Sequence, residues 1–149
     1  MGISIRRALP QDIPDLIVEL KEFSDFFQSK YPLFGSDEAY NYNILTSLIN
    51  NHLFFVAVKG DELIGFIAGL VMPHLFNPTI KTLQELFWWV KTAHRNSSAG
   101  SRLLKAYLDY GKEHCQWVIM TLEENSPVKK ESILSRGFKL KETAFIMEM

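Results

Sequence analysis

The sequence predicts a mixed α/β or α+β fold in which helices pack on a sheet. Its 149 residues are enough for a sizeable core, so we expect residues 1–149 to form a single domain. Several runs with strand character are interrupted by two long insertions of helical periodicity, which favours a mixed sheet. One of these runs, Leu83–Val90, is almost wholly apolar and fits a strand in the middle of that sheet.

The first third of the chain predicts one strand and two helices. Polar and apolar residues alternate over Ile3–Arg7, as in a strand. Pro10 opens a helix whose apolar residues recur at three- and four-residue steps as far as Phe23. A second helix is expected to begin after Ser36, its predicted N-cap, and its apolar stripe runs over residues 40–49.

Strands dominate the middle of the chain. Leu53–Val58 and Leu63–Val71 flank a turn typical of a hairpin. A loop over Met72–Thr82, broken by two prolines, then leads to the central strand Leu83–Val90. A short polar turn follows it, and a helix is predicted from about Ser97 to His114.

The remaining residues predict a strand, a short helix and two further strands. Gln116–Leu122 is the strand, and Ser126 is the expected N-cap of the helix over Val128–Arg136. A strand then starts at Gly137, and a final one covers Ala144–Met149. The expected order of elements is therefore β-α-α-β-β-β-α-β-α-β-β.

Composition narrows the class of protein. The formal net charge is −1 and 47% of the residues are hydrophobic, so nothing favours a nucleic-acid partner. A single cysteine, Cys115, excludes an internal disulfide and favours a reducing compartment. Apolar runs are too short for a membrane span, and no secretory signal is visible, so we expect a cytoplasmic protein with no membrane contact. Neither zinc-ligand spacing nor a hydrolase triad signature is present, so no metal site is predicted.

The turn after the central strand is a candidate anion site. Small residues there leave backbone N–H groups unshielded, and the first N–H groups of the following helix have no intrahelical partner. The helix dipole also favours an anion at this position. The alternative is that these residues only cap the helix. The candidate residues are Arg95, Asn96, Ser97, Ser98, Ala99, Gly100 and Ser101.

Glu85 is the candidate general base. A carboxylate among aromatic residues can have a raised pKa, which suits it to accept a proton near neutral pH. Strict alternation along the strand places Glu85 on the same face as Phe87 and Trp89. A glutamate that merely reaches solvent is the alternative, and His74, in the preceding loop, is a second candidate base.

The stretch from the central strand into the next helix resembles motif A of the GNAT family of N-acetyltransferases. Arg95, Gly100 and the Leu103–Leu104 pair fall where that family has them, whereas Ser98 and Asn96 replace two frequent glycines. The resemblance implies a mixed, mostly antiparallel twisted sheet and acetyl-coenzyme A as cofactor. The aromatic run before the motif is also similar to a subgroup of small phage and prophage acetyltransferases.

The same resemblance implies roles for further residues. The backbones of Trp88, Trp89 and Val90 would pair with the pantetheine arm, while their side chains pack in the core. Asn125 would contact the cofactor, or is simply a turn residue. Ile133 stands where many family members have a tyrosine that acts as general acid.

The function that follows is an acetyl-coenzyme-A-dependent N-acetyltransferase. It would move the acetyl group to a primary amine, on a small molecule or a peptide, by direct attack in a ternary complex. The alternative is a weakly active or inactive acetyl-coenzyme-A-binding module, or an interaction protein with the same fold. A homodimer is left open. An aromatic cluster that either borders the acceptor or packs in the core contains Phe26, Phe27, Tyr31 and Phe34.

Overall fold

The computed structural model describes residues 2–26, 31 and 34–149, and they form a five-stranded sheet in the order β1-β2-β3-β4-β5. The first four strands are antiparallel neighbours, and β5 is parallel to β4. The strands are β1 (Ile3–Arg7), β2 (Leu53–Lys59), β3 (Glu62–His74), β4 (Asn77–Val90) and β5 (Trp117–Ile119). The expected mixed, mostly antiparallel sheet of an α+β protein is confirmed.

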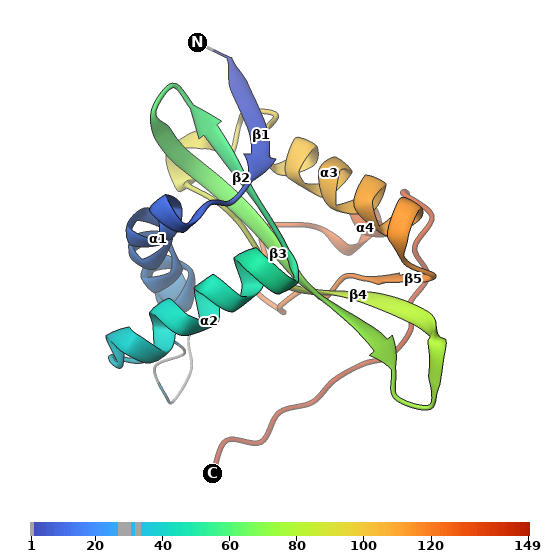
Figure 1. Ribbon diagram of the computed structural model, residues 1–149. Coiled ribbons are helices and arrows are strands. Elements are labelled where there is room, and N and C mark those ends of the chain that lie inside the picture. The colour runs from blue at the N-terminus through green and yellow to red at the C-terminus, as the bar shows by residue number, and fades with distance from the viewer. Residues whose placement is uncertain (1, 27–30, 32–33) are drawn as a thin grey trace.

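Helices cover both faces of this sheet (Figure 1). On one face, α1 (Ile13–Phe26) and α2 (Glu38–Asn51) enclose a core cluster that includes Phe54 and Phe66. On the other face, α3 (Ala99–His114) and the short α4 (Lys130–Leu134) enclose a second cluster. Two 3-10 turns, η1 (Pro10–Asp12) and η2 (Thr92–His94), precede α1 and α3.

Two aspartates hold the starts of the first two helices through hydrogen bonds. Asp37, not Ser36, is the N-cap of α2, because its carboxylate accepts a hydrogen bond from the Tyr40 N–H at 3.0 Å. Asp12 accepts one from the Leu9 N–H at 2.7 Å and forms an ion pair with Arg6, also at 2.7 Å. The hydrogen bonds from Arg6 lower the pKa of Asp12 and link β1 to the start of α1.

The long β3–β4 hairpin replaces the loop expected over Met72–Thr82. β3 continues to His74 and β4 begins at Asn77, so the two prolines lie within strands near the hairpin tip. There, Pro73 pairs with Lys81 just before a register irregularity. Proline is tolerated at such irregular positions of a sheet, which is why it does not end either strand.

A β-bulge in β4 corrects the expected alternation around Glu85. Ala68 pairs with Phe87 and Gly69 with Glu85, which leaves Leu86 as an extra residue in β4. Beyond the bulge, Phe87 belongs to the core cluster under α1 and α2. Glu85, by contrast, keeps the phase of Leu83, which packs against α3. Glu85 is therefore on the opposite face of the sheet from Phe87 and Trp89, contrary to the sequence-based expectation.

The C-terminal part of the chain departs most from the prediction. β5 covers only Trp117–Ile119, and α4 only Lys130–Leu134 with Lys129 as its N-cap. Neither the strand expected from Gly137 nor the one over Ala144–Met149 forms, because residues 138–149 pair with no strand of the described chain. Figure 1 shows this segment leaving the body of the molecule as an extended tail. No helix among the described residues is long and apolar enough to cross a membrane.

Candidate active site

A pocket lies where β4 and β5 separate. The two strands pair only through Thr82–Gln84 and Trp117–Ile119, and beyond Gln84 no described pairing joins them. The Tyr107 hydroxyl lies 3.2 Å from the Leu83 carbonyl and 3.1 Å from the Ile119 carbonyl, so it links both strands at the base of the split. The resulting cavity measures about 660 Å³ and is walled by the end of β4, the start of α3, residues 121–129 and α4.

Four predicted site residues, Glu85, Trp88, Trp89 and Val90, line this pocket from β4. Leaving the pairing with β5 frees one backbone edge of β4, which offers N–H and C=O groups to a ligand. The Trp89 ring is buried among the rings of Phe23 and Phe26, in agreement with the core role expected for its side chain.

The start of α3 forms a second wall. Ser97, Gly100 and Ser101 line the pocket, whereas Asn96, Ser98 and Ala99 are not among the lining residues. The Ser98 carbonyl accepts the Arg102 N–H at 3.0 Å, which closes the first turn of the helix. The N–H groups ahead of that turn have no intrahelical acceptor and, with the helix dipole, favour an anion here.

Arg95 lines the pocket, and its contacts are with β4 and α1. Its Nε donates to the Val90 carbonyl at 3.0 Å, and its guanidinium lies 4.5 Å from the centre of the Trp89 ring. The guanidinium also lies 5.4 Å from the centre of the Phe26 ring. One terminal nitrogen of Arg95 is buried and has no hydrogen-bond partner within the described residues. In this arrangement Arg95 fastens the turn before α3 to the end of β4.

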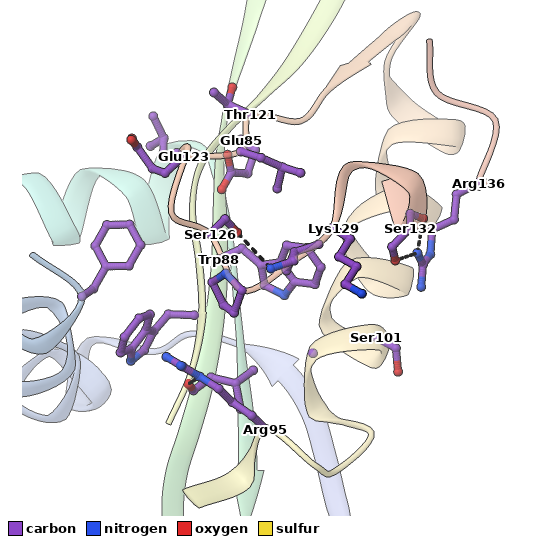
Figure 2. A pocket seen from close by; sticks show the side chains of 18 of the residues that line it. Glu85, Trp88, Arg95, Ser101, Thr121, Glu123, Ser126, Lys129, Ser132 and Arg136 are labelled. Carbon is purple, nitrogen blue, oxygen red and sulfur yellow. Dashed lines mark hydrogen bonds between the residues drawn. The ribbon is translucent and has the colours of Figure 1, made fainter. Parts of the chain in front are cut away.

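Glu85 is buried at the other end of the pocket, with 8% of its surface exposed. Burial is the main cause that raises the pKa of Glu85 to about 7; a backbone hydrogen bond from Thr121 opposes the increase, and the nearby Glu123 carboxylate adds to it. Figure 2 shows Glu85, Thr121 and Glu123 grouped together. A carboxyl with a pKa near 7 can take a proton from an amine at neutral pH and release it again.

A third group of lining residues was not identified from the sequence. Ser126, Lys129, Ser132 and Arg136 line the pocket from the loop before α4 and from α4 onward. Arg136 donates to the Ser132 hydroxyl at 2.7 Å, and Figure 2 shows Lys129 reaching toward the side where Ser101 lies. Lys129 and Arg136 thus add positive charge opposite the start of α3. The basic residues around the predicted short helix are the feature of the sequence that could have identified this group.

Three other candidates are not in the pocket lining. The Asn125 side chain donates to the Phe26 carbonyl at 3.2 Å and so ties this loop to the end of α1. The His74 ring packs edge-on against Trp117, with centroids 5.3 Å apart, at the β3–β4 hairpin. Ile133 is buried in the core cluster beside α3, while its neighbour Ser132 faces the pocket.

The predicted aromatic cluster divides between core and surface. Phe26 packs against Trp89, and Phe34 lies against the core cluster under α1 and α2. Tyr31 is 54% exposed, and Phe27 lies outside the described residues. Within the described residues, no group of three or more histidine, cysteine or acidic side chains could hold a metal ion.

Solved structures share this fold over nearly the whole chain. A ribosomal-protein-alanine N-acetyltransferase from Brucella melitensis biovar Abortus 2308 superposes with a TM-score of 0.79, at 13% identity, over 100% of this chain and 99% of that one. An aminoglycoside acetyltransferase from an uncultured soil metagenomic sample, in complex with sisomicin, gives 0.71 at 18% identity, over 99% and 96%. A transcriptional regulator from Bacillus halodurans C-125 gives 0.76 at 17%, over 99% and 100%. These identities establish the fold alone.

The sequence itself identifies the family. Comparison with curated protein sequences gives no significant match. The model of the acetyltransferase (GNAT) family, however, matches residues 20–130, which include the split strands, the turn and α3. None of these comparisons tests the similarity to phage proteins. The match covers most of the chain and agrees with the fold and the pocket, so this protein belongs to the acetyltransferase (GNAT) family.

Proposed function

We propose that the protein transfers an acetyl group from acetyl-coenzyme A to a primary amine by direct attack in a ternary complex. One observation carries the proposal. One pocket has basic side chains and the start of α3 at one end and, at the other end, a buried carboxyl whose pKa is about 7. The first end suits the phosphates of a thioester cofactor. The carboxyl at the second end suits an amine that must lose a proton.

The residues present fit coenzyme A chemically. The start of α3, at Gly100 and Ser101, would hold its pyrophosphate through backbone N–H groups. Lys129, on the opposite wall, adds a cation for the phosphates. The free edge of β4 over Trp88–Val90 offers backbone groups to the amides of the pantetheine arm. When bound, acetyl-coenzyme A supplies an acetyl thioester whose carbonyl carbon is open to attack.

The chain's own contribution to the reaction is to position the reactants and move a proton. Glu85 takes the proton that the amine loses on attack. Its pKa of about 7 matters because a base works best when its pKa is close to the pH of the solution. Backbone N–H groups of the free β4 edge are suited to stabilise negative charge that develops on a carbonyl oxygen. Thiolate is an adequate leaving group without an acid, since thiol pKa values are only mildly basic.

The acceptor is proposed only as a class. Two similar structures carry names that specify an amine acceptor, a ribosomal-protein alanine and an aminoglycoside. We extend from them only the primary amine, on a small molecule or a peptide. The buried Glu85 and the nearby Glu123 also give the pocket an acidic end, which favours a cationic amine over an anionic group.

A second candidate is a module that binds acetyl-coenzyme A with little or no catalysis. It is favoured by the position of Ile133, which is buried in the core, and by the absence of tyrosine from the described pocket lining. Thiol release and mass of the acetylated amine, measured over a panel of primary amines, separate the two. Amine-dependent release that yields acetylated product supports transfer. Binding of acetyl-coenzyme A with no product from any amine favours the module, and failure to bind it refutes both.

A further inference from the structure

Tyr107 of α3 lies beneath the pocket, at the point where β4 and β5 part. Its side chain is fully buried and does not belong to the pocket lining. The hydroxyl lies 3.2 Å from the Leu83 carbonyl on β4 and 3.1 Å from the Ile119 carbonyl on β5. A hydroxyl has one proton to donate, so the two carbonyls share it, and a single group joins both strands.

The two carbonyls stand at matching positions ahead of the base and of its hydrogen-bond donor. Leu83 precedes Glu85 by two residues, and Ile119 precedes Thr121 by two. Glu85 accepts a backbone hydrogen bond from Thr121. The Gln84 amide adds an exposed link, at 3.1 Å to the Thr121 hydroxyl. Because residues two apart in an extended strand lie on the same face, a constraint on the two carbonyls also fixes the separation of Glu85 and Thr121.

The neighbouring strand β3 leaves room for the Tyr107 ring at one position. Gly69 of β3 pairs with Glu85 next to the bulge. A Cβ at Gly69 would lie 2.9 Å from Cε2 of the Tyr107 ring and 2.8 Å from a Leu83 methyl, closer than carbon atoms normally approach. The lack of a side chain at Gly69 therefore lets the ring lie against β3, with its hydroxyl within reach of both parting strands.

Glu85 and Tyr107 are close enough to affect each other's ionisation. Burial raises the pKa of Tyr107, and the charge on Glu85 raises it further, so the hydroxyl stays protonated and keeps donating. From the segment after β5, Glu123 also acts on Glu85, whereas Gly69, opposite on β3, carries no charge. The basic side chains of the pocket lie away from Glu85 in Figure 2; they are Arg95, Lys129 and Arg136.

We propose that Tyr107 is a positioning residue for Glu85: its hydroxyl holds β4 and β5 at a fixed separation and closes the base of the split to water. The inference rests on the proposed acetyl transfer, in which Glu85 is the base. Without the hydroxyl, the two buried carbonyls lose the donor that they share, and buried carbonyls that lack a protein partner recruit water. Water at this place would solvate the Glu85 carboxylate and so remove the main cause of its raised pKa.

Replacing Tyr107 by phenylalanine removes the hydroxyl and keeps the ring that lies beside Gly69. Tyr110→Phe is the matched control, since Tyr110 lies on the same helix and its ring packs against His114. The pKa of Glu85 is measured from carboxyl-carbon NMR signals of glutamate-labelled protein, with Glu85→Gln to assign the signal and circular dichroism to check the fold. We expect the pKa to fall from about 7 toward the ordinary 4.5 in Tyr107→Phe and to stay at about 7 in Tyr110→Phe. A pKa that is unchanged or higher in Tyr107→Phe would overturn the inference.

Kinetics of the same variants test whether the position of Glu85 matters for the reaction. A weaker base takes a proton more slowly, so kcat of Tyr107→Phe should fall about three- to tenfold and its rise should move to lower pH. The Kd for acetyl-coenzyme A should not change, because the start of α3 is at the other end of the pocket. A loss shared equally between kcat and cofactor affinity would indicate a general disturbance of the fold and would contradict the positioning role. If the unchanged protein acetylates no amine, the proposed function fails, and the NMR comparison still decides whether Tyr107 controls Glu85.

A second variant, Gly69→Ala, keeps the hydroxyl but pushes on the ring, because the new Cβ would lie 2.9 Å from it. It also covers the case in which Tyr107→Phe does not fold. We expect the pKa of Glu85 to fall here as well. The double variant should add little to either single change, since both act through one contact. Shifts that add in the double variant would show that Gly69 acts apart from the hydroxyl, and would overturn this account of the contact.

Discussion

Replacing Glu85 by glutamine tests the general base and its burial with one substitution. Glutamine keeps the size and the accepting oxygen of the side chain but cannot take the proton. General bases contribute about 10²–10⁴-fold to a rate, so we expect kcat to fall by about that factor. Binding of acetyl-coenzyme A should be unchanged, because Glu85 is at the end of the pocket away from α3.

The raised pKa of Glu85 also predicts how the rate and the stability depend on pH. The ionised form is the base, so kcat should rise with pH through about 7, the pKa of Glu85. Stability should change in the opposite sense. The folded-state pKa of about 7 lies above the ordinary 4.5, so the folded protein holds this proton more tightly than the unfolded chain does. The free energy of unfolding therefore falls as pH rises from 4.5 through about 7.

The size of this effect follows from the pKa difference. Each pKa unit corresponds to about 1.4 kcal/mol, so the buried carboxylate costs up to about 3 kcal/mol above pH 7. Glu85→Gln removes that cost, so the variant should be the more stable protein at pH 8.5 by up to about that amount, and the gain should vanish toward pH 4.5. Urea unfolding at several pH values measures it.

Glu123→Gln is the matched control, because Glu123 is exposed and acts on Glu85 only by its charge. Removing that charge should lower the pKa of Glu85 and shift the rise in kcat to lower pH, with the plateau nearly unchanged. A Glu85→Gln protein that binds acetyl-coenzyme A and keeps its full rate at every pH would refute the role of Glu85 as base. Equal stability of variant and parent at pH 8.5 would refute the raised pKa.

Three further substitutions address the cofactor wall and the packing of β5. Gly100→Val should leave the fold intact, because a Cβ there meets Val90 at an ordinary 3.6 Å, but its side chain should obstruct the backbone N–H groups at the start of α3. Thermal melts should then lose the stabilisation of about 2.7 kcal/mol that is expected when acetyl-coenzyme A is in hundredfold excess over its Kd, and a normal shift would contradict the site. Lys129→Glu should weaken acetyl-coenzyme A binding at least tenfold by titration, and more so at low salt; unchanged affinity would remove Lys129 from the phosphate site. Gly111→Ala should destabilise the protein by about 1–3 kcal/mol in urea, because its Cβ would clash with a Val118 methyl; a neutral result would mean that β5 can shift away from α3.

Local patterns in the sequence were sufficient for most elements. The apolar periodicity of α1 and α3 and the alternation in β1 depend only on neighbouring residues, so they can be read without any tertiary contact. The β2–β3 hairpin is also local, since its turn has Gly60 at a φ of 63°, a conformation that favours glycine. The strand, turn and helix around Gly100 were located for the same reason.

Features that depend on pairing between distant segments needed the tertiary structure. The bulge at Leu86 reverses which face Glu85 occupies, and it exists only because β4 must match the register of β3. The split between β4 and β5 likewise arises from contacts between segments far apart in the sequence, and it brings Lys129 opposite the start of α3. The tail shows the converse case: its strand pattern is plain in the sequence, but a strand forms only where another strand supplies its hydrogen bonds, and residues 138–149 pair with no strand among the described residues.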